Sequence, residues 1–347
     1  MNISWMKSVP KVELHCHLDG SLPLEVIREL ANRNHIDIPK DDEGLRLQLQ
    51  AKKENKSLNE YLEKFDLPIR CLQRAEDLMY AAYQLVLEVA KEHVIYLEVR
   101  FAPKLHTQKS LTIHQVVEAV ILGLKKGQEE TQVTASAILC AMRHERQEDN
   151  MELLDVASQY LHKGVCGVDL AGNEGDFPPR LHQEFFYQAA QKEIPITIHA
   201  GECQNAQNIK DAIEMGATRI GHGIAMKGHT ELIKFVKDHK IGIEMCPTSN
   251  LQTKASNSME EYPFMEFYQQ GLLVSVHTDN RTVSGTTMSE ELLLLGNWYG
   301  LKKEDIKRLT LNSIHMAFAT DEEKEKLRDK VRAYDERSMD IKESYLK

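Results

Sequence analysis

Short apolar runs alternate with longer amphipathic stretches along most of the chain. Eight of these runs have the length and residue types of buried strands, at residues 12–18, 94–103, 133–141, 164–172, 195–201, 218–223, 241–247 and 273–280. Stretches with helical periodicity lie between them, at residues 78–91, 113–130, 151–161, 180–192, 209–215, 231–238 and 259–269. Such alternation is typical of an α/β protein with a parallel sheet. Eight units favour a closed (β/α)₈ barrel, the TIM-barrel architecture, over an open sheet.

One segment interrupts this alternation. Residues 19–93 separate the first two strands and are far longer than an ordinary strand-to-helix connection, so we expect a helical insertion there. Four apolar side chains in it share one face at helical spacing: Leu58, Tyr61, Leu62 and Phe65. This face can pack against the body of the protein, or it can form an apolar lid over the barrel mouth.

The end of the chain carries additional helices. Helical patterns follow the last strand at residues 289–298, 303–318 and 321–345, so residues 281–347 are predicted to add C-terminal helices to the barrel. No linker or low-complexity tract divides the sequence. We therefore expect residues 1–347 to form a single domain.

Composition narrows the classes of partner and compartment. The formal net charge of −10 disfavours loose binding to nucleic acids or anionic membranes. No apolar run approaches the ~20 residues that span a bilayer, and the N-terminus lacks the apolar core of a signal peptide. The six cysteines form no CxxC pair and fall mostly in apolar runs, which indicates reduced core residues and a cytoplasmic location.

Histidines stand at the end of the first predicted strand. In the segment His15-Cys16-His17, strand alternation places both imidazoles on one face and the thiol on the other. If that face points into the barrel, two imidazoles converge at its mouth. The alternative is a pair of exposed histidines at a strand end, because 15 histidines make chance pairs common.

Two further strands also end on histidines. His199 closes a buried-strand pattern, and Glu202 follows three residues later in the loop, where it can face a substrate or lie on the surface. His222 stands between Gly221 and Gly223, which permit a close backbone approach. His222 is therefore either near a ligand or bonded within the core.

The last predicted strand ends in His277-Thr278-Asp279. Alternation places Ser275, His277 and Asp279 on one face, and Asp279 can be an oxygen ligand to a metal. We expect His277 to lie behind the ligands or in the core, because the set of ligands is full without it.

These segments meet if the barrel prediction holds, because the carboxyl ends of its strands surround one mouth. We predict one metal ion with four ligands and room for a water: His15, His17, His199 and Asp279. Zinc is preferred over magnesium or calcium because imidazole nitrogen dominates the set. Zinc lowers the pKa of a bound water to ~7. With Glu202 as a proton donor and His222 beside the hydroxide, the set predicts metal-assisted hydrolysis.

The motifs closely resemble those of the adenosine deaminase family of the amidohydrolase superfamily. The matching segments are His15-Cys16-His17-Leu18-Asp19-Gly20, Asp169-Leu170-Ala171-Gly172-Asn173-Glu174, His199-Ala200-Gly201-Glu202, Gly221-His222-Gly223, Cys246-Pro247-Thr248-Ser249-Asn250 and Thr278-Asp279-Asn280. Their order and spacing follow the family from about residue 9 to about residue 320. Residues 58–66 resemble its apolar gate helix. The PCxxC pattern of the other zinc deaminases is absent from the sequence.

The resemblance implies a role for each candidate site residue. The zinc ligands would be the four residues named above, and His17 would also border the substrate. Glu202 would protonate N1 of the purine, and His222 would hold the attacking hydroxide. Asp19 would bind the ribose, Gly172 would donate its backbone N–H to N3, and Asn280 would address N7. The family often has aspartate at the last position, but an amide can donate to N7 as well.

The implied reaction is hydrolytic deamination of adenosine and 2′-deoxyadenosine to inosine and 2′-deoxyinosine with release of ammonia, a step of purine salvage. One rival is a related hydrolase of adenine or of an adenine nucleotide. A nucleotide would need a basic cluster, and Arg281 is the one basic residue beside the motifs, whereas Asp19 favours a ribose. The other rival is a non-catalytic binding protein, which the presence of every ligand, Glu202 and His222 disfavours. The sequence leaves the oligomeric state open.

Overall fold

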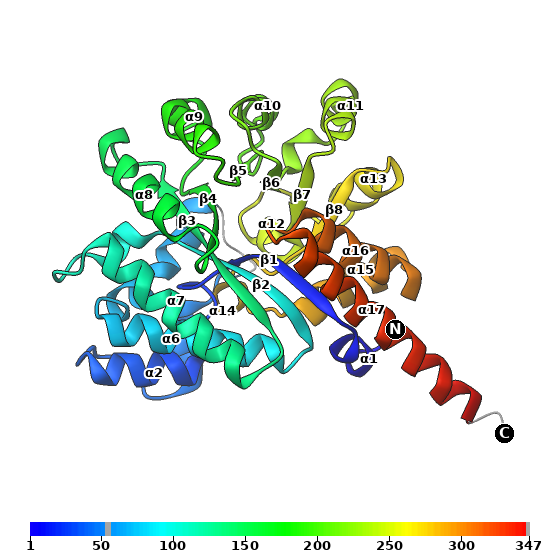
Figure 1. Ribbon diagram of the computed structural model, residues 1–347, viewed down its shortest axis with the longest axis horizontal. Coiled ribbons are helices and arrows are strands. Elements are labelled where there is room, and N and C mark those ends of the chain that lie inside the picture. The colour runs from blue at the N-terminus through cyan, green and yellow to red at the C-terminus, as the bar shows by residue number, and fades with distance from the viewer. Residues whose placement is uncertain (53–56, 345–347) are drawn as a thin grey trace.

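A closed barrel of parallel strands forms the centre of the molecule (Figure 1). The computed structural model describes residues 1–52 and 57–344, with side chains up to residue 334. Within them, eight strands run in chain order: β1 (Lys11–His17), β2 (Val94–Phe101), β3 (Thr134–Met142), β4 (Val165–Ala171), β5 (Thr197–Ala200), β6 (Arg219–His222), β7 (Gly242–Met245) and β8 (Leu273–Val276).

Backbone hydrogen bonds close the barrel where the ladders β1–β4 and β5–β8 meet. At one seam, the Val168 N–H donates to the Pro195 carbonyl at 2.9 Å. At the other, the Asp279 N–H donates to the His15 carbonyl at 2.8 Å, and the His17 N–H donates to the Asp279 carbonyl. The predicted (β/α)₈ TIM barrel is thereby confirmed. The second seam also brings the first of the site motifs, which contains His15 and His17, next to the last, which contains Asp279.

Helices surround the barrel and fill the connections (Figure 1). Before β2 lie α1 (Ile3–Ser8), α2 (Leu24–Arg33), α3 (Asp42–Leu49), α4 (Leu58–Leu62), η1 (Glu63–Phe65), α5 (Asp66–Cys71) and α6 (Ala75–Ala90). The later connections contain η2 (Pro103–His106), α7 (Ile113–Glu130), α8 (Gln147–Tyr160), η3 (Pro179–His182), α9 (Gln183–Gln191), α10 (Ala206–Glu214), η4 (Ile224–Met226), α11 (Thr230–Asp238), α12 (Pro247–Gln252) and α13 (Phe264–Gln269). After β8 come α14 (Arg281–Ser284), α15 (Met288–Tyr299), α16 (Lys303–Met316) and α17 (Asp321–Ser344).

Several predicted elements differ from the observed ones at their ends, such as the strand predicted over 273–280, which ends at Val276, and at two of them a proline gives the reason. The helix predicted over 259–269 begins only at Phe264, directly after Pro263 at its N-cap. The strand predicted over 241–247 ends at Met245, because Pro247 occupies the first position of a helix that the sequence pattern did not predict. A proline there has the φ angle that a first helical turn requires.

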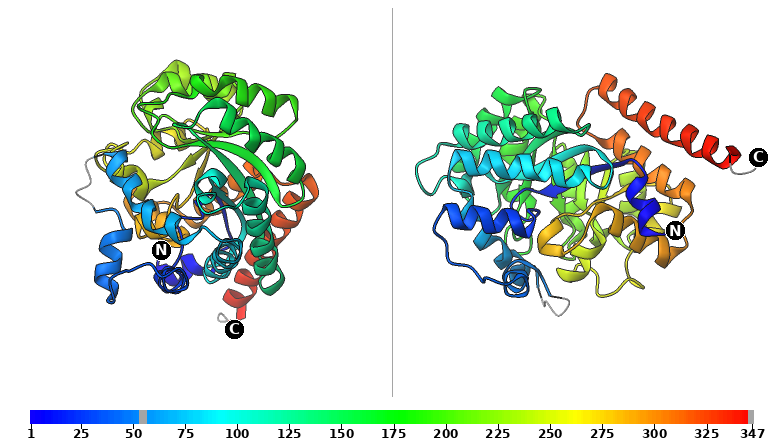
Figure 2. Two further views of the ribbon diagram at one scale, coloured as in Figure 1. Left: turned by 90° about the vertical axis from the view of Figure 1, so that its left-hand side faces the viewer. Right: turned by 90° about the horizontal axis from the view of Figure 1, so that it is seen from below.

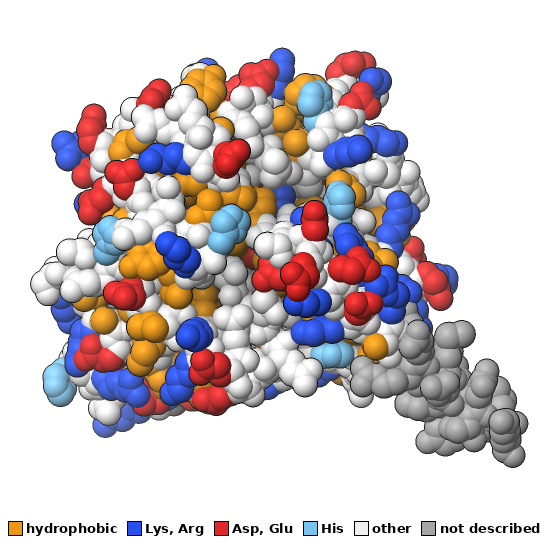
Figure 3. Space-filling model, viewed as in Figure 1, with side chains coloured by type: hydrophobic (Ala, Val, Ile, Leu, Met, Phe, Trp, Pro, Cys, Tyr) orange, Lys and Arg blue, Asp and Glu red, His pale blue; other side chains and the backbone are white. Residues whose placement is uncertain are grey.

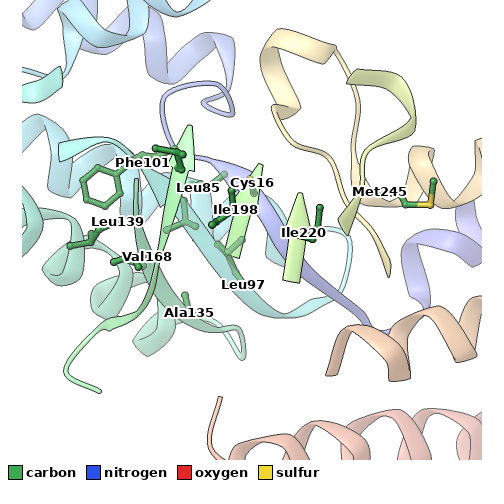
Figure 4. Packing of buried hydrophobic residues seen from close by; sticks show 14 of the residues in the cluster. Cys16, Leu85, Leu97, Phe101, Ala135, Leu139, Val168, Ile198, Ile220 and Met245 are labelled. Atoms are coloured by element: carbon green, nitrogen blue, oxygen red, sulfur yellow. The ribbon is translucent and has the colours of Figure 1, made fainter. Parts of the chain in front are cut away.

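The outward face of the barrel forms the main hydrophobic core. Leu97 and Phe101 of β2, Leu139 of β3 and Ile198 of β5 are buried against the surrounding helices, as Figure 4 shows. Burying a side chain of this size contributes about 1.5–3 kcal/mol to stability. Cys16 belongs to this outward cluster, and all six cysteines are free.

The inward face of the barrel carries charged side chains. Those that are almost completely buried include Glu98, Arg100, Asp169, Arg219 and Glu244. Arg219 lies 2.6 Å from Glu98 and 2.7 Å from Glu244, and Arg100 pairs with Asp169 at 2.9 Å. Removing one member of a buried ion pair costs about 3–5 kcal/mol, because its partner stays charged without compensation. The barrel interior therefore requires the complete set.

The face of the molecule shown in Figure 3 carries charged side chains of both signs. Figure 3 shows acidic and basic side chains interspersed over one face, with hydrophobic side chains gathered near its centre. No helix among the described residues combines the length and hydrophobicity needed to cross a bilayer. The helices α1 and α17 come together on the outside of the barrel, where the hydroxyls of Ser8 and Tyr334 lie 2.9 Å apart (Figures 1 and 2).

Candidate active site

Four side chains from three parts of the barrel converge on one point. The ligand atoms of His15, His17, His199 and Asp279 all lie within 4.8 Å of one another. The Nε2 atom of His199 is 3.1 Å from that of His15 and 3.2 Å from that of His17. Oδ1 of Asp279 is 3.3 Å from the Nε2 of His15 and 3.4 Å from that of His17. The structure thus brings together the ligand set that the sequence predicted.

The spacing of these atoms suits the ligands of one metal ion. Two atoms that each lie about 2.0–2.1 Å from the same zinc ion can be at most about 4.2 Å apart, and the four separations fall within that limit. Burial lowers the pKa of His15 to about 4 and also lowers that of His17, so both imidazoles are neutral at pH 7. Burial opposes the ionisation of Asp279, but its interactions with His15, His17 and His222 together outweigh burial and hold the pKa of Asp279 well below its usual range. Neutral imidazoles and a carboxylate are the forms that bind a metal.

Carboxylates behind the histidines fix their orientation. Nδ1 of His15 lies 2.8 Å from Oε2 of Glu244, and Nδ1 of His199 lies 2.9 Å from Oδ2 of Asp169. Since a carboxylate only accepts, each Nδ1 carries the hydrogen, and each Nε2 presents its lone pair to the cluster. Burial lowers the pKa of His199, but the charge and hydrogen bond of Asp169, together with the charge of Asp279, outweigh burial and raise that pKa, which makes the imidazole a more basic ligand.

Ser249 supports the fourth ligand in the same way. Its hydroxyl donates to Oδ2 of Asp279 at 2.6 Å, which leaves Oδ1 facing the histidines. The sequence interpretation assigned no role to Ser249, Asp169 or Glu244. Asp169 and Glu244 interrupt otherwise apolar strands, β4 and β7, and that interruption was the available signal.

The backbone at the site is held in unusual conformations. His222 has φ of 69° and Asp279 has φ of 59°, which are left-handed values that cost non-glycine residues about 1–3 kcal/mol each. Beside them, a Cβ on Gly221 would lie 3.0 Å from Cε1 of His15 and 3.3 Å from Cα of His199. The glycine before His222 is thus required for the close approach of β6 to the ligands.

His222 and Glu202 face each other next to the ligand cluster. Nδ1 of His222 accepts from Nδ2 of Asn250 at 2.9 Å, because the Oδ1 of Asn250 is already bonded to the hydroxyl of Tyr262 at 3.2 Å. The neutral ring therefore carries its hydrogen on Nε2, which lies 3.7 Å from Oε2 of Glu202. Burial raises the pKa of Glu202, which favours its protonated form.

Glu174 holds the loop that carries Glu202. Its carboxylate accepts from the backbone N–H groups of Gly201 at 2.7 Å, Glu202 at 2.8 Å and Cys203 at 3.1 Å. The amide of Asn208 donates to it as well, at 2.8 Å. The sequence interpretation quoted Glu174 within a matching segment but gave it no role.

A cavity of about 300 Å³ opens at this end of the barrel. Every predicted site residue except the fully buried His15 lines it: His17, Asp19, Gly172, His199, Glu202, His222, Asp279 and Asn280. The four apolar residues predicted as a lid, Leu58, Tyr61, Leu62 and Phe65, also line it. The described lining residues include no lysine or arginine. The cavity therefore joins an apolar wall to a polar end that carries the candidate metal ligands.

His277 lies apart from the cluster, inside the barrel. Its Nδ1 is 3.1 Å from Oε1 of Glu13, and its Nε2 is 2.7 Å from the hydroxyl of Ser275. Burial lowers its pKa to about 3, so the ring is neutral.

Comparison with known proteins agrees with this site. The family model described as "Adenosine deaminase" matches residues 10–334. The chain belongs to the adenosine deaminase family. It is 44% identical over 331 residues to an adenosine deaminase of Enterococcus faecalis, covering 95% of this chain and 98% of that protein.

Solved structures support the same family assignment. An adenine deaminase from Arthrobacter aurescens superposes with a TM-score of 0.87 at 26% identity, covering 95% of this chain and all of that one. The N6-methyl-AMP deaminase from Arabidopsis thaliana gives 0.84 at 29% identity, covering 98% and 100%. The resemblance is thereby confirmed: the protein is an enzyme of the adenosine deaminase family, a hydrolase of C–N bonds that deaminates adenosine-like substrates.

The carboxylate behind His199 yields a test of the metal site. Replacing Asp169 by asparagine should lower zinc affinity about 10–100-fold, because the imidazole loses the charge that makes it basic and fixes its tautomer. Competition with a chromogenic chelator at pH 7 measures this affinity. The control is Asp155→Asn, which changes an exposed carboxylate paired with Lys192 and should leave zinc affinity unchanged. Equal affinities in both variants would contradict the orienting role of Asp169.

Proposed function

We propose that this protein catalyses the hydrolytic deamination of adenosine and 2′-deoxyadenosine to inosine and 2′-deoxyinosine, with one zinc ion per chain and release of ammonia. The observation that carries the proposal is the convergence of four metal-ligand side chains at one end of a cavity that Glu202 and His222 also line. In metabolic terms, the reaction is a step of purine nucleoside salvage.

Zinc would be held by three imidazoles and one carboxylate, from His15, His17, His199 and Asp279. The predominance of nitrogen ligands supports zinc over magnesium or calcium. When bound, zinc lowers the pKa of a coordinated water to about 7, so that hydroxide is available at neutral pH.

Glu202 acts as the proton donor. Its raised pKa favours the protonated carboxylic acid, and this acid delivers its proton to N1 of the purine. Protonation of N1 prevents negative charge from building up in the ring as hydroxide adds to C6. His222 donates a hydrogen bond from Nε2 to the attacking oxygen. The hydroxyl proton of the adduct then passes to the amino group, the C6–N bond breaks with its electron pair going to nitrogen, and ammonia leaves as the C6 carbonyl forms.

Three residues on other loops would position the nucleoside. Asp19 is buried, and its Oδ1 has no hydrogen-bond partner among the described residues, so it can accept from ribose hydroxyls. Gly172, with φ of 107°, directly follows β4 and would donate its N–H to N3. Asn280 would donate to N7 from the loop after β8.

The cavity favours a nucleoside over a nucleotide. Phosphate sites use basic side chains, and the described lining residues offer none. Arg281, the basic residue beside the motifs, is instead paired with Glu92 at 2.6 Å. The carboxylate of Asp19 would further repel a phosphate. Because the structural neighbours include an adenine deaminase and an N6-methyl-AMP deaminase, substrate preference is the point to test.

Purified, zinc-loaded protein should therefore convert adenosine and 2′-deoxyadenosine far faster than adenine or AMP. The loss of absorbance that accompanies deamination measures all four rates under the same conditions. A protein that converts only adenine, or prefers AMP, would overturn the proposed substrate.

The role of Glu202 predicts a specific kinetic defect. Glu202→Gln should lower kcat by at least about 10²-fold, since positioned proton transfer contributes 10²–10⁴-fold, while zinc content and folding are retained. In the unsubstituted protein, kcat/KM should fall as the pH rises through the raised pKa of Glu202, because the acid form is the active one. The exposed Glu214→Gln is the matched control and should behave as the unsubstituted protein. Near-normal turnover by Glu202→Gln would refute the mechanism.

The apolar wall of the cavity is proposed to act as a lid that excludes water. Replacing Leu62 and Phe65 together with serine should raise KM for adenosine several-fold, because a drier site strengthens its polar interactions with the substrate. Kinetics and thermal unfolding are compared with Leu47→Ser, a change on an exposed side chain. A large fall in melting temperature with unchanged kinetics would show that this face only packs against the protein body.

A further inference from the structure

The hydroxyl of Tyr61 joins the wall of the cavity to the loop after β8. Tyr61 lies on α4, and its side chain is 2% exposed and lines the cavity. Its oxygen is 2.7 Å from the hydroxyl of Ser284 on α14 and 3.0 Å from Nδ2 of Asn280. None of the roles assigned above uses this hydroxyl.

In the side-chain amide of Asn280, the nitrogen has a hydrogen-bond partner and the oxygen has none among the described residues. Nδ2 donates one of its two hydrogens to Tyr61, which leaves the other for a ligand in the cavity that Asn280 lines. Oδ1 is buried without a hydrogen-bond partner among the described residues. A Cβ on Gly20 would lie 1.9 Å from that Oδ1, so the Gly20 backbone packs directly against it. Asn280 therefore offers the cavity a hydrogen-bond donor.

The two partners of the hydroxyl decide which way the amide faces. When Tyr61 donates its hydrogen to Ser284, its oxygen is left to accept from Nδ2 of Asn280. The backbone around Ser284 is fixed, because its carbonyl accepts from the side chain of Gln252 at 3.1 Å and its N–H donates to the Asn280 carbonyl. Without the hydroxyl, rotation of the amide by half a turn exchanges donor and acceptor, because the two ends have nearly the same shape.

We propose that Tyr61 is a positioning residue for purine recognition: its hydroxyl holds the Asn280 amide with Nδ2 available to N7 of the bound purine. This inference rests on the proposed function, which places N7 beside Asn280. Since N7 of a purine is an acceptor, the reversed amide would set two acceptors against each other. The same hydroxyl links α4 to the recognition of N7. The cavity wall therefore contributes to substrate specificity as well as to the exclusion of water.

The test compares two ligands that differ only at N7. Inosine carries the N7 acceptor, 7-deazainosine has a C–H in its place, and neither is deaminated. Their Kd values are measured by calorimetry on the zinc-loaded protein and on Tyr61→Phe. The unsubstituted protein should bind inosine about five- to tenfold more tightly than 7-deazainosine, the effect of one hydrogen bond. In Tyr61→Phe, which keeps the ring, the preference should fall below about twofold.

Two further variants separate this role from general loss of structure. Asn280→Ala should abolish the preference for inosine over 7-deazainosine. Adding Tyr61→Phe to Asn280→Ala should then leave the ratio of the two Kd values unchanged. Tyr262→Phe also removes a buried hydroxyl that bonds to an asparagine, Asn250, at 3.2 Å. It should leave the N7 preference at the unsubstituted value, even if it weakens both ligands.

The outcomes distinguish the inference from the function it rests on. A Tyr61→Phe protein that keeps the full preference overturns the inference, as does an unsubstituted protein that binds both ligands equally. Failure of the unsubstituted protein to deaminate adenosine overturns the proposed function instead, and the calorimetric preference still decides the role of Tyr61.

Discussion

One guanidinium group inside the barrel connects the two carboxylates on which the site depends. Arg100 donates to Asp169 at 2.9 Å and to Glu244 at 2.8 Å, and these carboxylates orient His199 and His15. All these side chains are removed from water, so none of the charges can be left unpaired without a cost of several kcal/mol. The positions of the metal-binding imidazoles are therefore set by the same ion network that fills the barrel.

The outward and inward faces of the barrel strands have different roles. The outward face, with residues such as Leu97 and Ile198, contributes hydrophobic stability by packing against the helices. The inward face contributes geometry, because its charged groups hold each other in fixed positions. The favourable packing of the first face can offset the left-handed backbone of His222 and Asp279, which is sterically costly but brings both side chains to the cavity.

Strand alternation carried most of what the sequence could predict. It placed His15 and His17 on one face opposite Cys16, as the contacts show. It also placed Ser275, His277 and Asp279 on one face, but β8 ends at Val276, and Thr278 bonds to the same Glu13 carboxylate as His277. It could not give depth along the barrel axis: His277 bonds to Ser275 and Glu13 in the interior, whereas Asp279 reaches the ligand cluster. It also could not pair Glu244 with His15 or Tyr61 with Asn280, because those contacts join residues more than 200 positions apart and depend on side-chain reach after the barrel has closed.

The convergence of three imidazoles and one carboxylate is proposed to form a zinc centre. Anomalous diffraction at the zinc edge, from crystals of the protein, locates the ion itself. One anomalous peak per chain is expected, about 2.0–2.2 Å from the Nε2 atoms of His15, His17 and His199 and from the carboxylate of Asp279. A stoichiometric zinc ion located elsewhere, with no anomalous density among these four side chains, would contradict it.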